Sequence, residues 1–232
     1  MNTSPALEAL KCASRNTPFV IAQLGQSLDG RIATVSGESR WINGTTALDH
    51  IHHIRANVDA VVVGVDTVLK DDPLLTVRRI TGKNPVRVVI DPNNRLPQHA
   101  RCFHQDDSSC IVIRGVRTHD KVGVTAHEKY NELFVLTKSR FLSPHEIIRQ
   151  LFALGLRRIF VEGGARTISK FIDADAVDRL HLLVAPIIIG SGKTGLQLKP
   201  IKTLKSARRP ATSTYYLGNG EILYDCDLRI MI

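Results

Sequence analysis

The sequence predicts an α/β fold in which helices cover both faces of a mixed, mostly parallel sheet. Short apolar segments alternate with segments of helical periodicity along most of the chain, which is the pattern of parallel strands buried on both faces. The last two apolar segments, 180–184 and 221–229, have no clear helical segment between them. We therefore expect some antiparallel pairing near the carboxyl end.

The predicted strands are short and apolar, and glycine, proline or polar residues bound them. The segment 59–64 is the clearest, because consecutive valines fill it. Residues 25–44 are rich in Gly, Ser and Asn and predict a long loop, which in a compact domain usually carries function. Strands are predicted at 19–24, 59–64, 86–90, 110–113, 133–136, 158–161, 180–184 and 221–229.

Helices are predicted where apolar residues recur at helical spacing behind a capping residue. Ser143 and Glu146 have the spacing of a capping box, and either Thr45 or Thr46 is expected to cap an earlier helix. A third helix follows a pair of glycines. The predicted helices cover 45–57, 143–155 and 165–172.

Composition bounds the class of protein. The 232 residues are 43% apolar and 23% charged, which is typical of one large globular domain. We expect residues 1–17 to form an N-terminal arm and residues 18–232 to form a single domain. No run approaches the ~18 apolar residues of a membrane span, and neither a secretory signal nor a Cys-x-x-Cys pair occurs. We therefore expect a cytoplasmic protein with no membrane contact, disulfide framework or metal site.

Net charge narrows the kind of partner. Lys and Arg number 31 against 22 Asp and Glu, for a charge of +9, which attracts nucleic acid or small phosphorylated ligands. The basic residues are scattered and aromatic residues make up only 5%, so we expect no nucleic-acid partner. A non-catalytic binder of nucleotides or nucleic acid stays as an alternative. His50, His52 and His53 predict a solvated helix face rather than a metal site, because no His-Glu-x-x-His pattern accompanies them.

Two loops that follow predicted strands could carry chemistry. Thr67 and Asp71 come after the valine strand, where a carboxylate can bind ribose hydroxyls, and Arg78 further along can clamp a phosphate. A helix cap and a plain turn explain Thr67 and Asp71 equally well. Gly163 and Gly164 connect a strand to a helix, a geometry that exposes backbone N–H groups to phosphate; a tight turn is the alternative.

The long loop 25–44 holds two further candidates. Its beginning, Gly25 to Arg31, directly follows the first strand, at the sheet edge where α/β folds place ligands. A turn at Asp29-Gly30 explains the same residues. Trp41 is the only tryptophan of the chain, and we interpret it as a packing anchor in preference to a ligand contact.

Taken together and in order, these motifs resemble the riboflavin-biosynthesis pyrimidine reductases, which occur as the reductase half of a bifunctional deaminase/reductase and as free-standing enzymes. The resemblance runs from about residue 19 to about residue 229. Its most specific part is Asp71-Asp72-Pro73-Leu74-Leu75-Thr76-Val77-Arg78. The other motifs are Leu28-Asp29-Gly30-Arg31, Gly37-Glu38-Ser39-Arg40-Trp41-Ile42, Ile54-Arg55-Ala56 and Val161-Glu162-Gly163-Gly164, followed by Val184-Ala185-Pro186 and Ile189-Gly190.

The resemblance implies a dihydrofolate-reductase-like three-layer fold, a homodimer and NADPH as cofactor. It implies reduction of the ribosyl group of 5-amino-6-(5-phosphoribosylamino)uracil, or of its 2,5-diamino-pyrimidinone counterpart, to ribityl. By motif, the substrate would contact Ser39, Arg55, Leu75, Arg78 and Glu162. The cofactor would contact Gly25, Trp41, Thr67, Asp71, Gly164, Ala165, Arg166, Thr167, Ile168, Ser169 and Lys170.

The sequence departs from the family pattern at two points. The deaminase zinc motif, His-x-Glu with Pro-Cys-x-x-Cys, is absent, which implies a free-standing reductase. Pro92 follows Asp91, where the bifunctional enzymes can carry a small hydroxyl residue, so Arg95 or Arg114 would have to bind the 2′-phosphate of NADPH, or NADH would be preferred. A pterin or another heterocycle is the alternative substrate, and Asp29 is a candidate proton relay.

Overall fold

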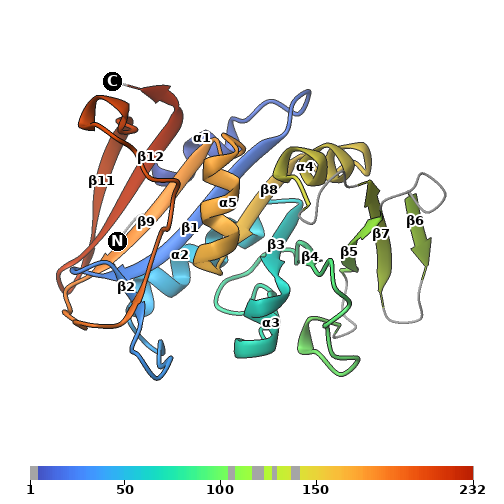
Figure 1. The fold of residues 1–232 in the computed structure, drawn as a ribbon, viewed down its shortest axis with the longest axis horizontal. Coiled ribbons are helices and arrows are strands. Elements are labelled where there is room, and N and C mark those ends of the chain that lie inside the picture. The colour runs from blue at the N-terminus through green and yellow to red at the C-terminus, as the bar shows by residue number, and fades with distance from the viewer. Residues whose placement is uncertain (1–4, 104–107, 117–122, 127–129, 137–141, 232) are drawn as a thin grey trace.

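In the computed structural model, the described residues are 5–103, 108–116, 123–126, 130–136 and 142–231. They form three layers, with a large sheet between two layers of helices (Figure 1). The strands of this sheet are β1 (Phe19–Ser27), β3 (Ala60–Gly64), β4 (Val86–Ile90), β5 (Cys110–Val116), β6 (Gly123–Ala126), β7 (Asn131–Leu136), β8 (Arg158–Glu162), β9 (Arg179–Ala185), β11 (Pro210–Gly218) and β12 (Glu221–Met231).

Within the described residues, the strand order is β11-β12-β9-β1-β8-β3-β4-β5-β7-β6. All neighbours from β9 through β7 pair in parallel. The pairs β9–β12, β11–β12 and β6–β7 are antiparallel. The structure thus confirms a mixed, mostly parallel sheet with antiparallel pairing near the carboxyl end. A small second sheet joins β2 (Arg31–Ala33) to β10 (Lys193–Thr194).

Successive valines of β3 explain why the sheet needs helices on both faces. Val62 belongs to the apolar cluster of one face, whereas Val61 and Val63 belong to the cluster of the other. All three are 0% exposed, so a strand in the middle of the sheet is apolar at every position. The first face is covered by α4 (Pro144–Ala153) and α5 (Ala165–Asp173), and the second by α1 (Glu8–Lys11), α2 (Thr45–Ala56) and α3 (Val65–Asp71).

The described part of the predicted N-terminal arm packs against the domain. A 3-10 turn at Pro5–Leu7 runs into α1, and Leu7 and Leu10 are buried in the same apolar cluster as Ile54 of α2. The side chain of Arg158 donates a hydrogen bond to the carbonyl of Lys11, which fixes the end of α1 over β8. Residues 1–4 of the arm lie outside the described residues.

The expectation of one loop over 25–44 is wrong at its start. Strand β1 continues through Ser27, because residues 25–27 pair with β9, and β2 forms inside the same stretch. Strand pairing is a long-range contact, so local composition alone misplaces the end of β1. The structure also adds α3, β6, β10 and β11, for which the sequence predicted no element.

The predicted side-chain capping hydrogen bonds of α2 and α4 are also wrong, because neither forms. Gly44 is the N-cap of α2, and Ser143 at the N-cap of α4 makes no capping hydrogen bond. Glu146 instead accepts hydrogen bonds from Arg149 and Gln150, because partners three and four residues away on a helix reach its carboxylate. The end of α4 is as expected, since Gly155 follows it with φ of +85°.

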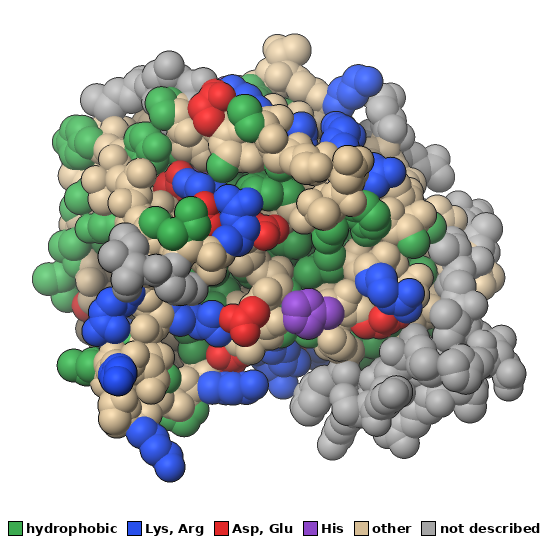
Figure 2. Space-filling model, turned by 90° about the horizontal axis from the view of Figure 1, so that it is seen from above, with side chains coloured by type: hydrophobic (Ala, Val, Ile, Leu, Met, Phe, Trp, Pro, Cys, Tyr) green, Lys and Arg blue, Asp and Glu red, His purple; other side chains and the backbone are tan. Residues whose placement is uncertain are grey.

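The histidines of α2 do not form a solvated face, which corrects the sequence interpretation. His50 is 0% exposed and His52 is 5% exposed. Nε2 of His50 lies 2.8 Å from Nδ1 of His181 on β9, and burial lowers the pKa of His50 to about 3. Basic side chains, by contrast, are dispersed among acidic and apolar ones on the face shown in Figure 2, with no single basic patch.

Candidate active site

A cleft of about 670 Å³ lies at the carboxyl ends of β1, β8 and β3, which are neighbours in the sheet. Its walls come from the segments that follow these strands and β9. This is the edge at which open α/β sheets bind ligands. Six residues predicted from the sequence line the cleft: Ser39, Thr67, Asp71, Gly164, Ala165 and Arg166.

The amino end of α5 approaches α3 closely because two positions lack a side chain. A Cβ atom on Gly164 would lie 2.8 Å from Oγ1 of Thr67, and one on Gly64 would lie 2.6 Å from Oγ1 of Thr167. Gly164 also has φ of +69°, a backbone conformation that favours glycine. The glycine turn therefore brings the amino end of α5, Ala165 and Arg166, to the wall of the cleft, and the amino end of a helix is where a phosphate group binds well.

The remaining predicted cofactor residues are spread over several environments. Ile168 is packed in the apolar core, and the buried Oγ of Ser169 accepts a hydrogen bond from the backbone of Gln197, a residue of the cleft wall. Neither Ile168 nor Ser169 lines the cleft itself. Gly25 lies within β1, where the side chain of Asn43 covers it. Trp41 is 70% exposed, so the interpretation of this residue as a packing anchor is wrong.

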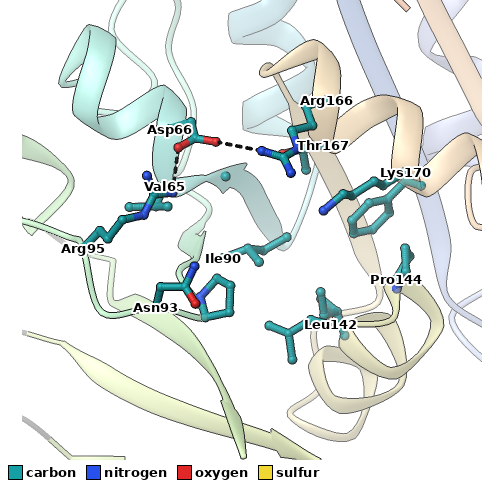
Figure 3. Close-up of a pocket in the computed structure, with 14 residues that line it drawn as sticks. Val65, Asp66, Ile90, Asn93, Arg95, Leu142, Pro144, Arg166, Thr167 and Lys170 are labelled. Atoms are coloured by element: carbon teal, nitrogen blue, oxygen red, sulfur yellow. Dashed lines mark hydrogen bonds and ion pairs between the residues drawn. The ribbon is translucent and has the colours of Figure 1, made fainter. Parts of the chain in front are cut away.

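A smaller hollow of about 140 Å³ adjoins the cleft (Figure 3). It is lined by Thr167 and Lys170 of α5, by Arg95 beyond β4, and by apolar side chains of α4. Asp66 and Arg166 line both cavities. The cleft and the hollow therefore meet at Asp66 and Arg166, and an elongated ligand with two halves could occupy both by extending past these two side chains.

Asp66 is the counter-ion of both arginines at this passage. Its Oδ1 lies 2.6 Å from Nη2 of Arg95, and its Oδ2 lies 4.0 Å from Nη1 of Arg166 (Figure 3). All three side chains are exposed by 45% or more, so the pairs are weak. An incoming phosphate can therefore replace Asp66 as the partner of either arginine.

The two arginines considered for the 2′-phosphate differ in availability. Arg114 is buried and forms ion pairs with Asp91 and Glu132, so it cannot reach a ligand. Arg95 is partly exposed at the hollow. Asp91 sets the position of Arg95, because its carboxylate accepts hydrogen bonds from the backbone of Arg95 and Leu96 at 3.0 and 2.9 Å. Pro92 lies inside this turn and also lines the hollow.

Two residues predicted to bind substrate form a buried pair instead of projecting into the cleft. The guanidinium of Arg55 donates two hydrogen bonds to Glu162, one of them at 2.7 Å, and a third at 2.8 Å to the carbonyl of Thr76. Arg55 is 6% exposed. The pair thereby supports the segment that carries two other predicted substrate residues, Leu75 and Arg78.

That segment, 74–78, runs without regular secondary structure past α2. Leu75 is 1% exposed and has φ of +59°, so it is a packing residue at a tight backbone bend. Arg78 is less buried, and its Nη1 donates to Oγ1 of Thr76 at 2.8 Å. Burial, and then the nearby charge of Arg55, lower the pKa of Arg78. A cation in that position gains by acquiring an anionic partner.

The candidate proton relay Asp29 is saturated with hydrogen bonds. Its carboxylate accepts from Oγ of Ser27 at 2.5 Å and from the backbone N–H groups of Ile189 and Gly190 at 3.1 and 2.7 Å. The bond from Ser27, then that from Ile189, lower the pKa of Asp29 to about 2. A group that stays ionised near neutral pH does not donate a proton there, so Asp29 holds the loop after β9 instead.

Sequence reasoning counted Ile189-Gly190 of that loop among the family motifs but assigned no site residue to the loop. Gly192, Lys193 and Thr194 line the cleft opposite α5. A Cβ atom on Gly192 would lie 2.2 Å from the carbonyl oxygen of Ala33, so this glycine lets β10 pair with β2. The signal was the string Gly190-Ser191-Gly192-Lys193-Thr194-Gly195, in which glycines flank a cation.

Two kinds of site are absent from the part of the chain that the structure describes. There, no three His, Cys, Asp or Glu side chains are grouped so that they could hold a metal ion. Over the same residues, every helix is too short or too polar to cross a membrane.

This chain belongs to the family of the RibD C-terminal domain, which matches residues 18–219. It is 34% identical over 176 residues to the 2,5-diamino-6-ribosylamino-4(3H)-pyrimidinone 5′-phosphate reductase of Methanothermobacter thermautotrophicus, covering 75% of this chain and 80% of that protein. It is 33% identical over 180 residues to the riboflavin biosynthesis protein RibD of Aquifex aeolicus, but spans only 49% of it.

Solved structures agree with this assignment. The deaminase/reductase of Thermotoga maritima superposes with a TM-score of 0.76 at 26% identity, covering 92% of this chain and 57% of that one. The riboflavin biosynthesis reductase Rib7 of Saccharomyces cerevisiae has a TM-score of 0.74 at 19% identity, over 97% of its length, which shows the fold alone. The family inferred from the motifs is thus confirmed, together with its dihydrofolate-reductase-like fold.

Proposed function

We propose that this protein binds NADPH and reduces a phosphoribosylamino-pyrimidine to its ribitylamino product, a step of riboflavin biosynthesis. The observation that carries the proposal is the meeting of α3, the glycine turn before α5 and the loop after β9 around one cleft. Relatives that share this fold are named as reductases of such a compound. The substrate is either the phosphoribosylamino-uracil or its 2,5-diamino-pyrimidinone counterpart.

The cofactor fits the two adjoining cavities. When bound, the reduced nicotinamide would supply a hydride to C1′ of the ribosyl group; the bond from C1′ to the ring oxygen breaks, and that oxygen takes a proton from water to become a hydroxyl. The glycine turn at Gly164 provides the close backbone approach that a pyrophosphate needs, beside Arg166. Thr67 and Asp71 offer a hydroxyl and a carboxylate to ribose in the cleft. The protein's own contribution is then mainly to position two reactants in one site.

The small hollow supports NADPH over NADH. Arg95 and Lys170 line it from opposite sides (Figure 3), and both are cations near the place where the adenosine half would lie. A 2′-phosphate there would replace Asp66 as the partner of Arg95 and gain a charge-assisted hydrogen bond. NADH carries only a hydroxyl at that position and would leave the Asp66–Arg95 pair in place.

We assign the substrate phosphate to Arg78, which follows the cleft residues of α3 in the chain and does not itself line the cleft. This cation is less buried than Arg55, and no carboxylate pairs with it among the described residues. Arg55 and Glu162 contribute indirectly: Glu162 holds Arg55, and Arg55 holds the carbonyl of Thr76 in the segment that carries Arg78. Ser39 lines the cleft and is available to the sugar hydroxyls.

A homodimer and a cytoplasmic location belong to the same proposal. The family resemblance supports the first. The absence of a long apolar run in the sequence supports the second. Sedimentation of the purified protein at several concentrations would measure its oligomeric state, and a single monomeric species would contradict the dimer.

The decisive experiment titrates the protein with NADPH and NADH and then adds the phosphoribosylamino-pyrimidine while the absorbance of the reduced nicotinamide is followed. We expect binding of NADPH and a fall in absorbance with the uracil or the diamino-pyrimidinone compound. Turnover of a dihydropteridine alone would favour the alternative reductase. No response to either coenzyme, together with a salt-dependent gel shift, would favour a non-catalytic binder.

A further inference from the structure

Side-chain hydrogen bonds fix the backbone of each residue in the segment 76–78, which follows α3 in the chain. The carbonyl of Thr76 accepts a hydrogen bond from Arg55, the N–H of Val77 donates to the side chain of Asn84 at 2.7 Å, and the N–H of Arg78 donates to Nδ1 of His52 at 2.9 Å. Three consecutive residues outside any helix or strand are thus fixed by side chains from elsewhere in the chain. Because these backbone groups have fixed hydrogen-bond partners, the irregular segment is held in a single conformation.

His52 and Arg55 act from the same helix. They lie three residues apart on α2, which places them on one face, and that face packs against the segment 76–78. His52 is 5% exposed. At this buried position its Nδ1 has the backbone N–H of Arg78 as its hydrogen-bond partner.

His52 can accept this hydrogen bond only when Nδ1 carries no proton. Burial, followed by the charges of Arg55 and Arg78, lowers its pKa to about 4, against the opposing effect of Glu162. The ring is therefore neutral near pH 7, with its proton on Nε2. A neutral acceptor is compatible with the surrounding arginines, whereas a further cation would be repelled.

We propose that His52 is a positioning residue, which fixes the backbone of Arg78 and thereby aims its guanidinium at the phosphate group of the substrate. The proposal rests on the proposed function in one respect, the binding of a phosphate by Arg78. It adds a residue to the site that lies on α2 and does not touch the substrate. It also explains why this helix carries a buried histidine facing three arginines, Arg55, Arg78 and Arg79.

Two substitutions of similar polarity separate this role from simple packing. Asn at position 52 places its side-chain oxygen near the position of Nδ1, so His52→Asn keeps an acceptor for the N–H of Arg78. His52→Gln places its amide group further out, near Nε2, and removes that acceptor. His53→Asn is the matched control, because it changes the neighbouring histidine, whose side chain makes no bond to Arg78.

Ribose 5-phosphate is the probe, titrated calorimetrically into each variant. We expect His52→Asn and His53→Asn to bind within about twofold of the unaltered protein, and His52→Gln to bind about 10-fold more weakly, the effect of one hydrogen bond. The affinity for ribose without phosphate should be the same for the unaltered protein and for all three variants. Equal affinities for the Asn and Gln variants at position 52, or equal losses for ribose and its phosphate, would overturn the proposal.

Kinetics give a second readout. His52→Gln should raise KM for the phosphorylated substrate about 10-fold with kcat unchanged, as expected when only ground-state binding is lost. In an Arg78→Ala background the same substitution should add nothing, because the group it positions is gone. An additive effect in the double variant would overturn the role. If ribose 5-phosphate binds through Arg78 but no pyrimidine is reduced, the proposed function fails while the role of His52 stands.

Discussion

Glu162, the last residue of β8, holds Arg55 of α2 through two hydrogen bonds and so ties the helix to the sheet beside the cleft. Their side chains are only 15% and 7% exposed. A buried guanidinium that also bonds the carbonyl of Thr76 is neutralised and fully engaged. The pair therefore supports, from within the protein, the segment that carries Arg78, the cation that we propose binds the substrate phosphate.

Removal of Glu162 should be strongly destabilising. Glu162→Ala leaves Arg55 buried without a counter-ion, which we expect to lower the free energy of unfolding by about 3–5 kcal/mol, measured by urea denaturation. The control Glu146→Ala removes an exposed pair with Arg149 and should cost at most about 1 kcal/mol. Similar small losses in both variants would show that the Arg55–Glu162 pair contributes little.

Removal of Arg78 should weaken substrate binding selectively. Arg78→Ala should raise KM for the phosphorylated substrate by about 30- to 1,000-fold, the effect of ~2–4 kcal/mol of lost charge-assisted binding. The affinity for NADPH should stay the same. Arg79→Ala is the matched control, since Arg79 is an exposed neighbour paired with Asp49. An unchanged KM in Arg78→Ala would remove Arg78 from the site.

A methyl group at Gly164 should close the coenzyme site. Gly164→Ala would bring its Cβ to 2.8 Å from Thr67 and strain a residue with φ of +69°. We expect lower stability and at least a 10-fold loss of NADPH affinity, measured by fluorescence titration. Gly155→Ala has a similar strain at φ of +85° with nothing within 4 Å, so it should lose stability but bind NADPH normally. Normal NADPH binding by both variants would show that the glycine turn is not part of the coenzyme site.

Asp29 should affect acid stability and leave the pH dependence of catalysis unchanged. Its pKa in the folded protein is about 2, below the ordinary 3.8, so its contribution is present above about pH 4 and is lost as the pH falls toward 2. The stability difference between the unaltered protein and Asp29→Asn should therefore shrink between pH 5 and pH 2, measured by urea denaturation.

The same variant tests the rejected proton relay. If Asp29 only holds the loop after β9, Asp29→Asn lowers activity by a constant factor from about pH 6 to pH 9. Loss of one limb of the pH–rate profile in this variant would instead give Asp29 a role in proton transfer.

Arg95 should decide between the two coenzymes. Arg95→Ala should raise KM for NADPH by about 10- to 100-fold, because a charge-assisted bond to the 2′-phosphate is lost, with KM for NADH unchanged. Arg149→Ala, an exposed arginine of α4 outside both cavities, is the control. Equal effects on NADPH and NADH would place the 2′-phosphate elsewhere.

The helices and strands were predictable where local patterns dominate. The run of valines in β3 predicted a strand buried on both faces, and Gly155 predicted the end of α4. Capping was not predictable from residue type, because Glu146 had nearer partners than the backbone of its own helix. The end of β1 was set by pairing with β9, a contact between segments far apart in the chain.

The sequence by itself determined the fold class, the family and the order of the loops that meet at the cleft, since these depend on local periodicity and on motifs of adjacent residues. Only the tertiary structure decided which side chains reach a ligand. It buried Arg55 against Glu162, engaged Arg114 with Asp91, exposed Trp41 and placed His52 beneath Arg78. Burial and charge pairing depend on neighbours distant in the chain, and residue type alone does not specify those neighbours.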